Sequence, residues 1–395
     1  MFEYVVLRRS ESGAPISAGQ IAEALLFYQR VHVVLDRSTL LHLVKQIGPS
    51  ELVGLTRRAD FSAVYTEEML ATMSNPVGTL QVHDFGAVRF AGDQTAGTLK
   101  SPEDRLAFDL TRAGVKPADA RRFAKALLAK VPVRKLSGNH YVEGGIPAAA
   151  RSDLQDGAYV LAVIRALLPL MPGGYDPGPT LKFDVVSSAL GFYTFQNIDL
   201  EAINSRRAAA NPPEEPLTIA FLLGKLQDAR ADIAMAAHYG GDFFTSADTS
   251  AVVRLRHEVL LQRTGSNAKS LTSFKEIALP DMPTLGEVID SGERSFRDFL
   301  NLLDRASRFK DWIKSANPDL GLAREYLHSV SKQDWIQTPK LRGIRYVLTL
   351  ALDATNPLAG LAAGFADNFL VEKLLGGWKP NHFIQGRLGP FVNVN

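Results

Sequence analysis

The sequence predicts a mixed α+β protein, with an N-terminal α/β lobe of short parallel βαβ units followed by a mostly α-helical lobe. Two patterns support this class. Over residues 1–70, short runs of β-branched and aliphatic residues alternate with helical patterns, which is typical of βαβ units. From Pro216 onward, apolar residues recur almost throughout at helical spacing. The chain has 395 residues, and 46% of them are hydrophobic, which is enough for a sizeable core.

The N-terminal elements follow one another closely. Phe2–Leu7 is predicted as a strand, and the helix after it has Ser17 as its N-cap. Val31–Asp36 is predicted as a buried strand because it is rich in valine. The next helix begins near Ser38 and ends at Gly48, a residue type that commonly ends helices. The stretch "FSAVYTEEML" is then predicted as a strand that turns into a helix.

The middle of the chain mixes both kinds of element. Thr79–Asp93 has the pattern of two short strands around Asp84–Gly86, hence a hairpin or a sheet edge. Two helices are predicted next, in "SPEDRLAFDLTRAG" and "PADARRFAKALLAK", and Leu181–Phe195 has a strand-like composition. We therefore divide the chain into an α/β lobe at 1–135 that ends in a basic helical pair, a mixed connecting region at 136–215, and a helical lobe at 216–395.

The composition excludes several classes of function. Cysteine is absent, which removes disulfides, thiolate metal sites and cysteine nucleophiles. The formal net charge is +2, so binding to nucleic acid or to an anionic membrane would have to come from a local patch. The first residues lack the pattern of a signal peptide, and the absence of cysteine suits a reducing compartment. We therefore expect a cytoplasmic protein of bacterial type.

Four carboxylates suggest a metal-dependent catalytic site. Asp36 ends a buried strand just before a helix, where α/β enzymes often place a metal ligand. Glu67 and Glu68 follow the next strand, and Asp104 would supply further oxygen ligands. Over roughly the first 110 residues this order resembles the small PIN-type nucleases, and the resemblance implies carboxylates that hold Mg²⁺ or Mn²⁺ to activate a water. The structural alternative is that Asp36 caps its helix and that the two glutamates stabilise a helix N-terminus.

A basic segment runs from Arg121 to Lys135 without an acidic residue. Together with the helix before it, this segment has the order helix–turn–helix, and Gly114 suits the turn. A nucleic acid is therefore a possible partner, whereas a solvated helix face is the plainer alternative. The candidate nucleic-acid-binding residues are Arg121, Arg122, Lys125, Lys130, Arg134 and Lys135.

The most apolar stretch of the chain is Thr355–Pro380. It predicts a helix that forms a hairpin with the preceding helical stretch "LRGIRYVLTLALDA". Asp367, Glu372 and Lys373 lie inside it, and a central Asp or Lys costs about 2.5–3.5 kcal/mol in a bilayer. We therefore expect the hairpin to close a water-soluble core, and constitutive membrane insertion is disfavoured. A membrane-active effector that releases the hairpin on a trigger is an alternative.

No motif identifies an enzyme. The sequence has no phosphate-binding loop of the Walker type, no dinucleotide-binding glycine pattern after a strand and no nucleophile elbow. Asp228, Asp232 and His238 follow one another along one predicted helix, but the paired Glu-x-x-His motifs of a two-metal bundle are absent. The leading hypothesis is therefore an interaction or regulatory protein with a protein partner. The nuclease and the membrane-active effector are the alternatives.

Overall fold

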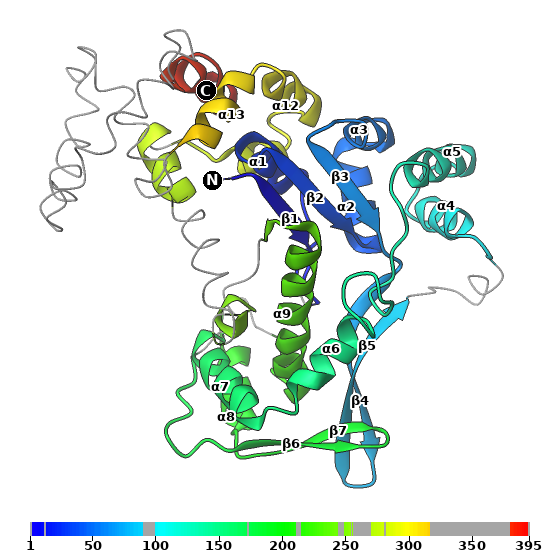
Figure 1. The fold of residues 1–395 in the computed structure, drawn as a ribbon, viewed down its shortest axis with the longest axis vertical. Coiled ribbons are helices and arrows are strands. Elements are labelled where there is room, and N and C mark those ends of the chain that lie inside the picture. Colours follow the sequence, from blue (N-terminus) through cyan, green and yellow to red (C-terminus); the bar gives the residue numbers. More distant parts are fainter. Residues whose placement is uncertain are drawn as a thin grey trace, which may run out of the picture. The chain divides into compact units, whose positions relative to one another are not determined.

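The structure is a computed structural model that describes residues 2–11, 13–89, 99–171, 174–210, 215–243, 249–253, 255, 270–279, 282–316 and 380–393 (Figure 1). It contains a parallel sheet with helices and a helical region, which confirms the predicted α+β class. The chain forms two compact units: the first comprises Met1–Glu3, Ser17–Arg30 and Thr264–Asn395, and the second comprises Tyr4–Ile16 and Val31–Arg263. The predicted three-part division at 135 and 215 stays a prediction. The C-terminal hairpin predicted over 341–377 lies outside the described residues.

The second unit contains a parallel four-stranded sheet with the strand order β3-β2-β1-β8 (Figure 1). Its strands are β1 (Tyr4–Arg8), β2 (Arg30–Leu35), β3 (Phe61–Tyr65) and β8 (Asp242–Phe243). β2 and β3 run parallel in register, and so do β1 and β8. Both faces of these strands are apolar, as expected for a parallel sheet that is covered on both sides. Because β2 and β8 lie on opposite sides of β1, the direction of the strand order changes beside β1, where α/β proteins often bind ligands.

Two helices connect β2 to β3. They are α2 (Arg37–Ile47) and α3 (Pro49–Leu55). The Oδ1 atom of Asp36 accepts a hydrogen bond from the Thr39 amide at 2.7 Å, which confirms that Asp36 caps this helix. Gly48 has φ of 82° and separates the two helices, and Pro49 begins the second at the position where its missing amide hydrogen is tolerated.

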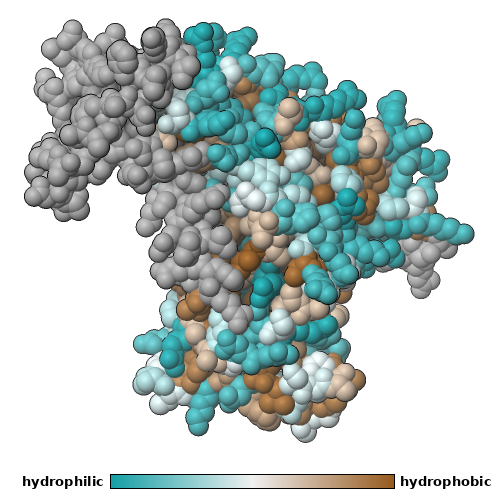
Figure 2. Space-filling model, viewed as in Figure 1, coloured by the Kyte–Doolittle hydropathy of each residue, from teal (hydrophilic) through white to brown (hydrophobic). Residues whose placement is uncertain are grey.

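A second, antiparallel sheet has the strand order β4-β5-β7-β6. Its strands are β4 (Glu68–Val77), β5 (Leu80–Arg89), β6 (Phe183–Ser188) and β7 (Gly191–Gln196). Strand-like structure was expected in Leu181–Phe195, and it is confirmed there as the β6–β7 hairpin. Apolar side chains remain exposed toward the hairpin ends of this sheet, among them Val77, Leu80 and Leu190 (Figure 2).

Two predictions for this region are wrong. The helix predicted after "FSAVYT" is the strand β4, so Glu67 and Glu68 do not stabilise a helix N-terminus. The turn predicted at Asp84–Gly86 lies inside β5, which pairs with β4 from Glu68↔Arg89 to Val77↔Leu80. Ten cross-strand residue pairs outweigh the weak local preference of this segment, because strand propensity depends mainly on pairing and packing.

The remaining helices of the second unit are α4 (Pro102–Arg112), α5 (Pro117–Leu128), α6 (Ile146–Asp153), α7 (Gly157–Leu167), α8 (Leu200–Ala208) and α9 (Ile219–Tyr239), with a 3₁₀ turn at Leu168–Leu170. The predicted pair α4 and α5 is confirmed, with Gly114 at φ of 94° in the turn between them. After α5 the chain returns to the edge of the parallel sheet, where Val133 forms a parallel bridge to Tyr65. That bridge fixes the start of the loop that leads to α6.

Helix α9 contributes to two hydrophobic clusters of the second unit. Ala231, Ala234 and Met235 pack with Val6, Val34 and Val64 from the parallel sheet. Leu222, Leu223 and Leu226 belong to the other core, with side chains of α7 and of the antiparallel sheet. Burial on two sides explains why this helix is apolar over most of its surface.

The first unit is helical in its described part. Its helices are α1 (Ala18–Phe27), α11 (Leu285–Asp290), α12 (Phe296–Leu303), α13 (Ser307–Ser315), α17 (Pro380–Phe383) and α18 (Gly389–Val392), with a π-helical turn at Ile384–Leu388. The sequence pattern predicts one helix over Arg294–Ala316, but the chain forms α12 and α13 with a turn between them. Trp312 is buried, and the Phe309 ring stacks on it and on Phe383. Trp312 therefore packs in the core of this unit.

None of the helices that the structure describes combines the length and the apolar content that a membrane crossing requires. The stretch that prompted the membrane hypothesis is outside those helices. The membrane-active effector therefore stays a prediction.

Candidate functional site

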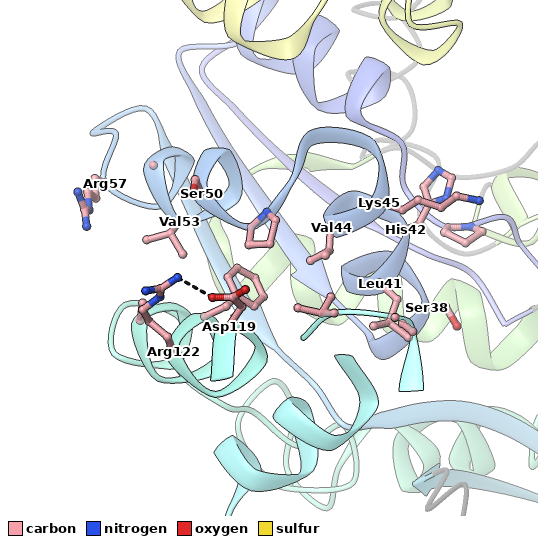
Figure 3. A pocket seen from close by; sticks show the side chains of 18 residues that line it. Ser38, Leu41, His42, Val44, Lys45, Ser50, Val53, Arg57, Asp119 and Arg122 are labelled. Carbon is pink, nitrogen blue, oxygen red and sulfur yellow. Dashed lines mark hydrogen bonds and ion pairs between the residues drawn. The ribbon is translucent and has the colours of Figure 1, made fainter. Parts of the chain in front are cut away.

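A groove of the second unit lies between the α2–α3 pair and the α4–α5 pair (Figure 3). It has a volume of about 1170 Å³, which is in the range of ligand-binding clefts. Leu41 and Val44 from α2, Val53 from α3, and Val115 and Phe123 from the α4–α5 side give it apolar walls. Helices, rather than loops, supply most of this lining, so the shape of the groove is built into the scaffold.

The sequence explains why these helices leave a groove. In α2, Leu40 and Leu43 are buried, whereas Leu41 and Lys45 lie one turn apart on the side that faces the groove. On the opposite side of the groove, Gly114 lies in the short turn between α4 and α5. Beyond its neighbours in the chain, no atom of the described residues lies within 4 Å of the position that a Cβ atom would take at Gly114. A bulkier turn would narrow the groove at this end.

The rim of the groove is basic. Lys45 from α2, Arg57 after α3 and Arg122 from α5 are all exposed and line the groove. Asp119 is the only acidic side chain in the lining, and its carboxylate accepts a hydrogen bond from Arg122 at 2.7 Å. Neither Lys45 nor Arg57 forms an ion pair within the described part of the chain. The rim therefore presents more positive than negative charge to a ligand.

The four carboxylates proposed for catalysis do not form one cluster in the structure. Asp36 accepts from the Thr39 amide and pairs with Arg9 at 3.2 Å. Both oxygens of Glu67 accept hydrogen bonds from the Arg105 guanidinium, at 2.6 and 2.7 Å. Ser101 caps α4 by accepting a hydrogen bond from the Asp104 amide, and the exposed Asp104 carboxylate accepts one from the Ser101 hydroxyl at 2.6 Å.

Two of the four carboxylates, Asp36 and Glu68, line the same cavity. This small cavity of about 30 Å³ lies outside the carboxyl ends of β1 and β3, and Arg8 and Arg9 also line it. The Glu68 carboxylate accepts hydrogen bonds from the amides of Leu136 and Ser137 and from the Ser137 hydroxyl. Across the described residues, no three metal-ligating side chains are placed to share an ion. The nuclease hypothesis stays a prediction, and these contacts do not favour it.

A buried ionic network beside this cavity was not predicted. The Arg8 guanidinium pairs with Asp228 at 2.9 Å and with Asp232 at 2.8 Å. The backbone amide of Glu11 donates to Asp228, and the Glu11 carboxylate accepts from the Thr72 amide at 2.8 Å. Burial raises the pKa of Glu11 to about 7, and the neighbouring Asp228 adds to the rise. Asp228 and Asp232 thus bind Arg8, which lies more than two hundred residues away in the sequence. No local sequence pattern could predict this contact.

The basic segment is mostly on the surface. Arg121, Arg122 and Lys125 are exposed on α5, and Lys130 and Lys135 are exposed after it. Arg134 is partly buried, and its charge acts on His140, Tyr141 and Tyr239. Hydrophilic side chains cover much of the outer surface around α4 and α5 (Figure 2). These positions leave the nucleic-acid hypothesis open as a prediction.

Comparisons with protein-family models, with curated proteins and with solved structures gave no match. The features that indicate a function are therefore the shape and the charge of the groove and the buried polar groups of the second unit.

Proposed function

We propose that this chain is an interaction protein that holds an acidic amphipathic segment of a partner protein in the groove between α2–α3 and α4–α5. The supporting observation is the combination of apolar walls with a basic rim in one cleft of about 1170 Å³. An amphipathic helix would place its apolar side chains against Leu41, Val53 and Phe123 and its carboxylates toward the rim. A cytoplasmic location belongs to the same proposal and is supported by the absence of cysteine.

The two parts of the groove would have different roles. A partner side chain such as leucine contributes about 1.5–3 kcal/mol when it becomes fully buried against apolar walls. An exposed ion pair to Lys45 or Arg57 contributes only about 0.2–1 kcal/mol, because water screens it. The apolar walls would therefore supply most of the affinity, and the cations would orient the partner and speed its association.

Photo-crosslinking in cells tests this proposal. A benzophenone amino acid replaces Val53 inside the groove, and the same amino acid replaces the exposed Gln155 as a control outside it. We expect discrete covalent adducts from position 53 and none from position 155. The double variant Lys45→Glu and Arg57→Glu should remove the adducts, because it reverses the charge of the rim. Adducts that form equally at both positions, or that survive the charge reversal, would contradict the proposal.

A second candidate is nucleic-acid binding through α5, and the exposure of Arg121, Arg122 and Lys125 on that helix favours it. A DNA or heparin column distinguishes the two functions. Replacement of these three residues by glutamate should abolish retention if α5 contacts phosphates. Unaltered and salt-insensitive elution would dismiss this candidate.

A further inference from the structure

Three histidines and two tyrosines from distant parts of the sequence gather in the second unit. His32 lies on β2, His140 and Tyr141 lie in the loop between α5 and α6, and His238 and Tyr239 end α9. The ring centroids are 3.8 Å apart for His32 and Tyr239, 4.5 Å for His140 and His238, and 6.1 Å for the two tyrosines. We call these five residues the His–Tyr cluster.

Buried polar atoms without a hydrogen bond are found at the cluster. Within the described residues they include Nε2 of His32 and Nε of the neighbouring Arg134. The Tyr141 hydroxyl donates to the Tyr239 oxygen, which leaves the Tyr239 hydroxyl proton without an acceptor. His32 is only 3% exposed and Tyr141 only 8%. Such unpaired atoms are rare because burial removes their water, so their concentration at one place indicates a missing polar partner.

The chemistry of these atoms specifies the partner. Nε of Arg134 and the Tyr239 hydroxyl can donate hydrogen bonds to a ligand, and the guanidinium is permanently charged. Nδ1 of His32 lies 2.8 Å from the Ser62 hydroxyl, and when that hydroxyl donates to Nδ1 the proton of the ring sits on Nε2. The titratable groups that act on the cluster are its own members, Arg134 and Tyr4, and no carboxylate is among them. The site therefore offers donors and positive charge.

We propose that the His–Tyr cluster and Arg134 form a binding site for a small oxyanion, such as a phosphate, sulfate or carboxylate group. Arg134 is held in place because its backbone amide donates to the Tyr65 carbonyl at 2.8 Å, next to the bridge at the sheet edge. His238 is exposed and His140 is partly exposed, so an anion reaches the buried donors from their side. This site is separate from the groove proposed for a protein partner.

The electrostatics of the His–Tyr cluster agree with this assignment. Burial lowers the pKa of His32 to about 4, and His238 and His140 add to the effect. Burial, His238 and Arg134 lower the pKa of His140. A bound anion would favour the protonated imidazoles, so it should raise the pKa of these histidines. A purely structural cluster would show no such response.

The test uses the full chain with inorganic phosphate, sulfate and acetate, each against chloride at equal ionic strength. Thermal unfolding and the NMR titration of the histidine rings are measured at millimolar anion. We expect one or more of these anions to raise the unfolding temperature and the pKa of His140 or His32. Acetate separates a carboxylate ligand from a tetrahedral oxyanion.

Variants connect the response to the site. Arg134→Gln removes the charged donor and should weaken anion binding by about tenfold or more. Arg165→Gln, on the exposed side of α7, is the matched control and should leave binding unchanged. If Arg134→Gln does not fold, Tyr141→Phe removes one buried hydroxyl with little change in volume and should also weaken binding. No response to any of the three anions, or an equal response in wild type and in these variants, overturns the site and leaves water as the partner of the buried atoms.

Discussion

Replacement of Glu11 by glutamine should remove a pH dependence from the stability of the second unit. The Glu11 carboxyl group is largely buried, and its Oε1 atom accepts the Thr72 amide hydrogen at 2.8 Å. Glutamine keeps an oxygen for this hydrogen bond but carries no charge at any pH. The variant therefore isolates the energy of ionising a carboxyl group in this buried network.

The magnitude follows from the pKa. Burial raises the pKa of Glu11 from its ordinary 4.5 to about 7 in the folded protein. Between these values the folded state keeps the proton while the unfolded state loses it, so stability falls as the pH rises through this window and is level above it. At about 1.4 kcal/mol for each pKa unit, the wild-type protein loses about 3 kcal/mol between pH 4.5 and pH 7. Glu11→Gln should escape this loss and be more stable than wild type at pH 8.

Urea unfolding followed by circular dichroism, at pH 5 and at pH 8, measures the effect. The difference between wild type and Glu11→Gln in the free energy of unfolding should grow toward pH 8 by about 3 kcal/mol. Other carboxyl groups titrate in both proteins, and the comparison removes their contribution. If the two proteins show the same pH dependence, Glu11 is not buried in the neutral form and the reasoning fails.

Three further predictions concern folding energetics. Arg8→Ala should cost about 3–5 kcal/mol in urea unfolding, because it leaves two buried carboxylates of α9 without their guanidinium; an unchanged midpoint would contradict this. Gly191→Ala should destabilise the protein by about 1–3 kcal/mol, because Gly191 has φ of 132° and a Cβ atom there would strike the His83 carbonyl. Gly157→Ala is the control: no described atom outside its own helix lies within 4 Å of a Cβ at that position, so this change should be neutral or slightly stabilising. Phe309→Ala should lower the stability of the first unit by about 3–5 kcal/mol in calorimetry, because the ring is fully buried among other aromatic rings; a smaller loss would mean that the site collapses around the cavity.

The elements that the sequence predicts correctly are those with local signals. Asp36 caps α2 as expected, because the cap and the amide that it binds are three residues apart. The α4–α5 pair is recovered for a similar reason, with Ser101 and Gly114 at its boundaries. Strand β4 is missed because its hydrogen bonds come from β5, and short polar–apolar segments carry little information about a strand until its partner is known.

The candidate sites are harder to predict because they are assembled across long distances in sequence. The loop "SGNHYVEGG" and the end of α9 are each visible in the sequence, but nothing local indicates that His140 and His238 lie side by side. The groove is likewise formed by helices that belong to different parts of the chain, and Arg122 alone of the candidate catalytic and nucleic-acid-binding residues lines it. For the candidate carboxylates the opposite holds. Glu67 and Glu68 are adjacent in the sequence, but they bind different partners in the fold.

Helix α9 has a consequence for how the second unit unfolds. A helix of 21 residues is about 31 Å long, and this one supplies buried side chains to two hydrophobic clusters of the unit, one against each sheet. Neither core keeps its packing if α9 detaches, so the two sheets should lose their protection against amide hydrogen exchange together. The second unit would then unfold as a single cooperative unit. A ligand bound at one sheet would slow amide hydrogen exchange in the other sheet as well.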